Sequence, residues 1–206
     1  MHNHNRCGSD VQFDGSSNSY KRVLIIIIII NFTMFGVELG GGLISGSMAL
    51  LADCMDFLAD SATYTISLIV IGMPITTRAK ASMFKGLSLL VIAIWIFYST
   101  FMAMINGGVP EPYTMGTIGF IAFLANLVSA LLLLRYKEGD ANVRSVWLCS
   151  RNDAIGNIVV MIAASGILVS NAAWPDLTVA FIMVSLFSHS AFLIIRQSWK
   201  ELKLGN

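Results

Sequence analysis

The stretch that decides the fold is residues 21–44, which read KRVLIIIIIINFTMFGVELGGGLI. Two basic residues precede an apolar run that continues to residue 44, and an α-helix needs about 20 such residues to cross the hydrocarbon core of a membrane. The run is too long for the apolar part of a secretory signal peptide, and no cleavage site made of small residues closes it. We therefore predict a membrane-spanning helix over residues 23–44.

Five more apolar segments of similar length follow along the chain. Hydrophobic residues make up 56% of the 206 residues and charged residues only 12%, which is too apolar for a soluble domain of this size. Glycine, proline or charged residues separate the segments, as expected for turns between helices. We predict an all-α membrane protein with six transmembrane helices, whose remaining spans cover residues 47–73, 82–105, 115–136, 146–170 and 175–195.

The positions of lysine and arginine predict how the spans are oriented. Basic residues stand before the first span and after the second, fourth and sixth, whereas the other connections carry none. Cytoplasmic loops are the ones enriched in Lys and Arg, so both termini are expected in the cytoplasm. The expected organisation is a flexible cytoplasmic tail over 1–20, a six-helix transport domain over 21–197 and a short cytoplasmic tail over 198–206, with no further cytoplasmic domain.

Acidic residues inside the second and fifth spans are the main functional signal, because an ionisable group within a membrane is costly. Asp56 and Asp60 are one helical turn apart and share a face of the second span. Cys149 and Asp153 have the same spacing in the fifth span. If the two faces meet, these side chains supply the four ligands of a tetrahedral zinc site. Packing roles stay open for Asp153, which could bond a neighbouring helix, and for Cys149, which could fill space.

Other polar residues in the spans are candidates for lining an ion pathway or supporting the ligands. These residues are Glu38, Asp53, Asn126, Asn157 and His189. For each of them, hydrogen bonding between helices is the alternative role. In the N-terminal tail, His2, His4 and Cys7 could collect metal loosely or have no role.

Several classes of function are excluded. The formal net charge is +1, so the chain offers no basic face for nucleic acid. It contains no glycine-rich nucleotide loop and no peptidase motif, so we expect neither an enzyme activity nor a prosthetic group. Its three cysteines cannot form a disulfide framework.

The run Gly-Ser-Met-Ala-Leu-Leu-Ala-Asp over 46–53, followed by Asp56 and Asp60, resembles the second helix of the cation diffusion facilitator family. Asp153 and Cys149 match the aspartate and histidine positions of that family's fifth helix, with cysteine in place of the usual histidine. The resemblance covers residues 20–200. It implies export of divalent metals, usually zinc, in exchange for protons. It also implies an ion site between the second and fifth helices, formed by Asp56, Asp60, Cys149 and Asp153.

The predicted function is efflux of a divalent transition metal, with Zn²⁺ or Cd²⁺ as first choice because a thiolate suits borderline and soft ions. Metal/proton antiport is the expected mechanism. A passive uniporter or channel is one alternative, and a non-transporting membrane subunit or sensor is another. We expect a multi-pass protein of a bacterial inner membrane whose partners are metal ions, protons and lipid.

A homodimer held by the transmembrane helices is also expected. Most members of the resembled family dimerise with the help of a cytoplasmic domain that is not expected here. The third span offers an apolar surface for this contact, formed by Leu89, Ile92, Ile96 and Met102. Gly36 and Gly40 form a small-residue face on the first span, which permits close helix contact within one chain or between chains.

Overall fold

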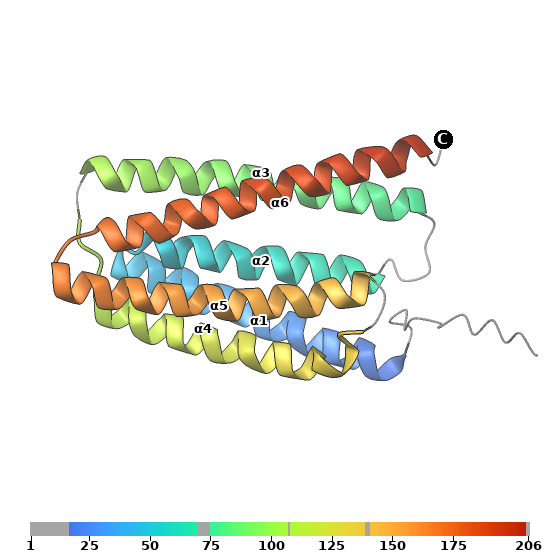
Figure 1. The fold of residues 1–206 in the computed structure, drawn as a ribbon, viewed down its shortest axis with the longest axis horizontal. Coiled ribbons are helices and arrows are strands. Elements are labelled where there is room, and N and C mark those ends of the chain that lie inside the picture. Colours follow the sequence, from blue (N-terminus) through green and yellow to red (C-terminus); the bar gives the residue numbers. More distant parts are fainter. Residues whose placement is uncertain (1–16, 70–74, 107, 139–140, 205–206) are drawn as a thin grey trace, which may run out of the picture.

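The computed structural model describes residues 17–69, 75–106, 108–138 and 141–204, and every element in these ranges is helical. The elements lie side by side along the long axis of the molecule (Figure 1). They are α1 (Asn18–Ser45), α2 (Met48–Ile69), α3 (Ile75–Asn106), α4 (Pro112–Leu133), the short 3₁₀ helix η1 (Leu134–Tyr136), α5 (Ala141–Ser170) and α6 (Trp174–Leu204).

Local capping explains where several helices begin and end. The Ser17 side chain accepts a hydrogen bond from the Tyr20 amide and starts α1, so the helix begins before the predicted span. Gly46 ends α1 in the left-handed conformation, with φ of 70°, which glycine adopts without steric cost. The helices α1, α3, α5 and α6 are longer than the predicted spans because hydropathy marks only the apolar part of each helix. The predicted tail from residue 198 is accordingly helical as far as Leu204.

Glu111 starts α4 by the same principle. Its carboxylate accepts hydrogen bonds from the backbone N–H groups of Thr114 and Tyr113, at 2.6 and 2.9 Å. The hydrogen bonds from Thr114 and Tyr113 lower the pKa of Glu111, because they stabilise its charged form. Pro112 occupies the first turn of the helix, where a missing N–H costs nothing.

The helices form two groups. One group contains α1, α2, α4 and α5, with α1 against α2 and α4 against α5. The other is the pair α3 and α6, which pack against each other along their length and contact the first group through α2 and α5 (Figure 1). Close approach depends on small residues: a Cβ on Gly86 of α3 would stand 2.8 Å from Ile195 of α6. The helix α2 therefore has a central place, in contact with α1, α3, α5 and α6.

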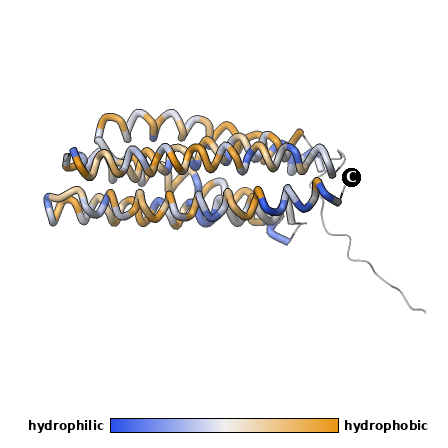
Figure 2. The backbone as a smooth tube through the Cα atoms, turned by 90° about the horizontal axis from the view of Figure 1, so that it is seen from above, coloured by the Kyte–Doolittle hydropathy of each residue, from blue (hydrophilic) through white to orange (hydrophobic). Residues whose placement is uncertain are grey.

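Five of the described helices are long and apolar enough to cross a membrane. These candidate spans are Asn18–Ser45, Met83–Asn106, Pro112–Tyr136, Ser150–Ser170 and Trp174–Lys200. The helix α2 is not among them, because it carries Asp53, Asp56 and Asp60. Apolar residues dominate the bundle (Figure 2), and many large ones, such as Ile29, Val91 and Val169, are exposed on it. The chain is thus an integral, multi-pass membrane protein, while the count of six spans stays a prediction.

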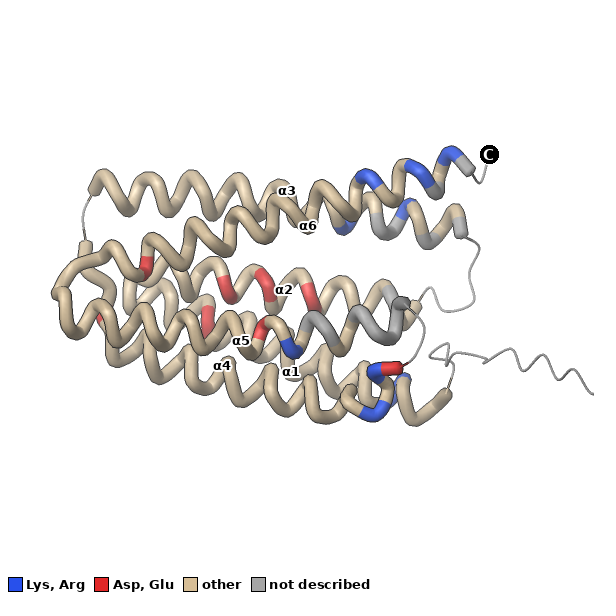
Figure 3. Tube along the Cα trace, in the orientation of Figure 1, with Lys and Arg blue, Asp and Glu red and all other residues tan. Residues whose placement is uncertain are grey.

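Basic residues of the described helices gather toward the end of the bundle where the chain's C-terminus lies (Figure 3). Acidic residues of α2 and α5 lie instead in the middle part of the bundle. The basic residues of the described helices thus lie mostly toward one end of the bundle. The cytoplasmic location of the termini stays a prediction. Residues 1–16, with His2, His4 and Cys7, lie outside the described part of the chain.

The predicted dimer surface on the third span is wrong for two of its four residues. Leu89 and Ile96 are 5% and 1% exposed, because they pack within the chain against α2 and α6. The face of α3 that points outward carries instead Val91, Ile94 and Tyr98. The homodimer itself stays a prediction.

Of the two contacts expected for the small-residue face of α1, within one chain or between chains, the first is not formed. A Cβ on Gly36 or Gly40 would meet no atom within 4 Å, so neither glycine supports a contact inside the chain. Close packing uses the next two glycines. A Cβ on Gly41 would stand 2.9 Å from Ile118 of α4, and one on Gly42 would stand 2.9 Å from Leu51 of α2.

Asp176 of α6 ties that helix to the beginning of α2. Its carboxylate accepts hydrogen bonds from the Ser47 hydroxyl at 2.6 Å and from the Met48 and Ala49 amides at 2.8 and 3.1 Å. The Ser47 hydroxyl in turn accepts from the Leu50 amide at 3.0 Å. These bonds satisfy the free N–H groups of the first turn of α2 and place a negative charge at the positive end of the helix. The first turn of α2 is therefore held by a residue 127 to 129 positions away.

We expect Asp176→Ala to destabilise the protein by roughly 2–5 kcal/mol, since it removes a helix cap and several charge-assisted hydrogen bonds in a buried place. The measurement is the free energy of unfolding in mixed detergent micelles. Asp176→Asn keeps acceptor capacity without the charge and should give an intermediate loss. Thr178→Ala, on an exposed position of the same helix, is the control. An Asp176→Ala protein as stable as that control would contradict the role of the cap.

Candidate metal site

Three carboxyl groups from two helices meet in the interior of the four-helix group. Asp56 and Asp60 are one turn apart on α2, and Asp60 is only 8% exposed. Asp153 of α5 lies within hydrogen-bonding distance of both of them. Asp153 thus approaches the face of α2 that carries Asp56 and Asp60, where α2 and α5 are in contact.

Carboxyl groups this close cannot all carry a negative charge without a compensating positive one. Lys85 of α3 acts electrostatically on Asp56 and Asp60. Arg151 of α5 does not contribute in the same way, since it is exposed, stacks over the Trp147 ring at 5.2 Å and hydrogen-bonds Asn152 at 3.0 Å. The cluster is therefore short of positive charge and suited to a cation.

One neighbour orients a carboxyl group of this set, and a second bonds the backbone beside it. The Tyr64 hydroxyl, one turn after Asp60 on the same helix, donates a hydrogen bond to the Asp60 carboxylate. The Asn157 side chain donates to the backbone carbonyl of Asp153 at 3.0 Å. Sequence reasoning included Asn157 but missed Tyr64 and Lys85. The signal for Tyr64 was its four-residue spacing from Asp60, whereas no spacing links Lys85 to α2.

The fourth predicted ligand, Cys149, belongs to α5 one turn before Asp153, but its side chain lies outside the described part of the structure. Among the described side chains, no three of the His, Cys, Asp and Glu type are grouped closely enough to hold an ion as they stand. The carboxyl groups of α2 and α5 are therefore neighbours that would have to close around an ion. The complete ligand set stays a prediction.

The other polar residues predicted to line the ion pathway or support the ligands differ in their burial. Glu38, Asp53, Asn126 and Asn157 are all buried, with exposed fractions of 0 to 2%. His189 is exposed on α6, so it differs from these four. The buried face of α6 at this level is formed by Phe187 and Ala191 instead. A role of His189 beside the ion pathway therefore gains no support from its place in the fold.

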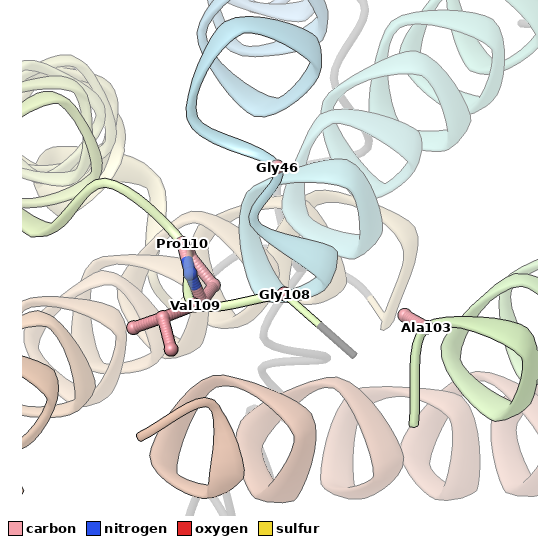
Figure 4. A pocket seen from close by; sticks show the side chains of 5 residues that line it. All are labelled: Gly46, Ala103, Gly108, Val109 and Pro110. Carbon is pink, nitrogen blue, oxygen red and sulfur yellow. The ribbon is translucent and has the colours of Figure 1, made fainter. Parts of the chain in front are cut away.

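A shallow pocket of about 180 Å³ lies away from these carboxyl groups, at the turn between α1 and α2 (Figure 4). Its lining consists of Gly46, Ala103, Gly108, Val109 and Pro110. None of these five residues has a side chain that binds a metal ion, so the pocket is not a second candidate for the ion site.

The chain resembles known proteins over most of its length. The model of the cation efflux transmembrane domain matches residues 24–203. A cadmium, cobalt and zinc/H⁺-K⁺ antiporter of Bacillus velezensis is 26% identical over 99% of this chain and 67% of its own length. Zinc transporter ZitB of Escherichia coli is 29% identical over 98% of this chain and 65% of its own length. Metal cation efflux system protein CzcD of Cupriavidus metallidurans is 23% identical over 90% of this chain and 62% of its own length. The chain thus spans about two thirds of the length of these relatives.

Proposed function

This chain belongs to the cation efflux family, and from that premise we propose that it transports a divalent transition metal out of the cytoplasm in exchange for protons. The observation that carries the proposal is the meeting of Asp56 and Asp60 of α2 with Asp153 of α5 inside a membrane bundle. Relatives named as zinc transporters and as a cadmium, cobalt and zinc antiporter support the choice of cargo. The proposed cargo is Zn²⁺ or Cd²⁺.

The proposed ligands are Asp56, Asp60, Asp153 and Cys149. Carboxylates and a thiolate must lose their protons to bind a metal ion, so metal binding displaces protons from the site. When the site opens to the other side of the membrane, protons bind the ligand atoms and displace the metal ion. The ligands come from two helices, so a small movement of α5 against α2 changes the geometry at the ion. Such a movement links binding of the ion to access from one side or the other.

The test is metal flux in proteoliposomes with a panel of Zn²⁺, Cd²⁺, Co²⁺, Ni²⁺ and Mn²⁺, measured with and without a pH gradient. Flux that rises with an opposing proton gradient supports antiport. Flux of the same size with and without the gradient would identify a passive uniporter. Metal binding by purified protein without any flux would identify a sensor or a non-transporting subunit.

Cys149→Ser should weaken cadmium transport more than manganese transport. A serine hydroxyl stays protonated and is a hard, poor ligand, whereas thiolate favours soft ions. The loss for Cd²⁺ should be at least about tenfold, since loss even of a ligand's supporting partner costs 10–100-fold in metal affinity. Cys149→His is the matched variant and should keep zinc transport, because imidazole is also a good zinc ligand. Unchanged cadmium flux in Cys149→Ser would assign Cys149 to packing.

A further inference from the structure

A second pair of carboxyl groups lies outside the proposed metal site. Glu38 of α1 and Asp53 of α2 face each other within hydrogen-bonding distance, and they are 0% and 2% exposed. Both Glu38 oxygens and the Asp53 Oδ2 have no hydrogen-bond donor in the protein. Two ionised carboxylates are both acceptors, so they can bond each other only through a proton that one of them carries.

The pair occupies its own level in the bundle. Asp53 precedes Asp56 by three residues and Asp60 by seven, which places it about 4.5 and 10 Å closer to the α1–α2 turn along the helix axis. Glu38 comes from α1, which contributes no residue to the proposed metal ligands. The pair thus shares α2 with the proposed metal ligands but lies about one helical turn before Asp56, and its second carboxyl group comes from α1.

Among the described residues, no positively charged group acts on Glu38 or Asp53. The groups that act electrostatically on Glu38 are Asp53, Cys54 and Asp56, all on α2. The other helix packed against α1 is α4, which carries no charged residue between Pro112 and Leu133.

Three described charged groups on the other neighbours of α2 act on residues outside the pair. Lys85 of α3 and Asp153 of α5 act on Asp56 and Asp60. Asp176 of α6 caps the beginning of α2. Two negative charges in a dry interior without a basic partner are strongly unfavourable, so the pair requires a cationic ligand.

Of the available cations, a proton fits this pair best. A transition metal ion is bound by about four ligands, and Glu38 with Asp53 offers one carboxyl group from each helix. The nearest thiol, Cys54, already donates its proton to the Leu51 carbonyl at 3.1 Å. A proton needs only one donor oxygen and one acceptor oxygen, and the facing carboxyl groups provide these.

We propose that Glu38 and Asp53 form a proton-binding pair that carries one proton per transport cycle, in addition to the protons displaced from Asp56, Asp60 and Asp153. This inference rests on the proposed function. Loading forms an O–H bond on one carboxylate with a proton taken from water on one side, and the second carboxylate accepts a hydrogen bond from it. Release breaks that O–H bond and returns the proton to water on the opposite side, when the bundle has opened there.

The first experiment needs no transport. Infrared difference spectroscopy in H₂O and D₂O on the purified protein should show the C=O stretching band of a buried, protonated carboxyl group. The spectrum of the wild-type protein minus that of Glu38→Gln or Asp53→Asn, which keep the shape of each side chain, should contain one such band. The protonated carboxyl group of the metal site is present in all three proteins and cancels. Cys54→Ser is the control at the same depth and should give no band in its difference from the wild-type protein. Absence of the band from both of the first two difference spectra overturns the proposed pair.

The second experiment measures metal flux and proton flux together in proteoliposomes under a fixed metal gradient. Glu38→Gln should lower the proton-to-metal ratio by one, measured at whatever metal flux the variant retains. Because a coupled pair titrates as a unit, Glu38→Gln/Asp53→Asn should give the same loss and no more. An unchanged ratio in variants that have lost the band overturns the transport role. A wild-type protein without metal flux refutes the proposed function, while the infrared band still decides whether the pair holds a proton.

Discussion

Asp60→Asn should abolish metal transport and leave the protein folded. The substitution removes one negative ligand from the meeting point of α2 and α5 but keeps an oxygen that can accept the hydrogen bond from Tyr64. Substitution of a residue that only hydrogen-bonds a metal ligand already lowers metal affinity by about 10–100-fold. Loss of a ligand itself should therefore lower metal affinity by at least about 100-fold. Asp153→Asn should have the same effect on transport.

The stability of Asp60→Asn should equal or exceed that of the wild-type protein. Replacement of one of three neighbouring carboxylates relieves their mutual repulsion and the cost of burying a charge. Asp60→Ala is less favourable as a test, because it also removes the acceptor for the buried Tyr64 hydroxyl.

The measurement is metal uptake into proteoliposomes at equal protein amount, with thermal stability in detergent as the check on folding. Ala62→Ser, at an exposed position two residues further along α2, should transport at the wild-type rate. Tyr64→Phe should lower transport without abolishing it, since it removes only the hydrogen bond that orients Asp60. Wild-type flux in folded Asp60→Asn would refute the assignment of the metal site.

The all-helical fold could be predicted from the sequence because five of the helices contain an apolar stretch long enough to cross a membrane, and α2 has a similar stretch interrupted by three aspartates. The ends of the helices were harder to predict, because capping residues such as Ser17 and Glu111 lie outside the apolar stretches that hydropathy detects. The packing of one helix against another could not be predicted from hydropathy. Leu89 and Ile96 are as apolar as a lipid-facing residue, so composition alone could not show that they pack inside the chain.

The candidate site was predictable where its residues share one helix. The spacing of Asp56 and Asp60 placed both on one face of α2, and the structure brings Asp153 to that face. Contacts between segments that are far apart in the sequence follow no regular spacing of this kind. Neither Asp176 at the first turn of α2 nor Lys85 beside the carboxyl groups could be deduced from spacing, since both come from other helices.

Metal affinity should fall steeply as the pH drops from about 8 to 6. Protons and the metal ion compete for the same oxygen and sulfur atoms, so affinity is highest at high pH and is lost as the ligands take up protons. Each proton displaced on binding changes the affinity by about tenfold per pH unit. With three carboxyl groups in mutual reach, at least one holds a proton when the metal is absent, because all three cannot ionise together.

Isothermal titration of Zn²⁺ or Cd²⁺ in buffers of different ionisation heat counts the protons released at each pH. A count of one or more, with the matching slope of affinity against pH, is the expected result. Glu111→Gln is the control, because this exposed carboxylate caps α4 outside the membrane interior and should leave the count unchanged. Asp56→Asn should reduce both the count and the slope, since it removes one of the competing carboxylates. A count of zero would contradict antiport, because an ion that displaces no protons from its ligands cannot be exchanged for protons at that site.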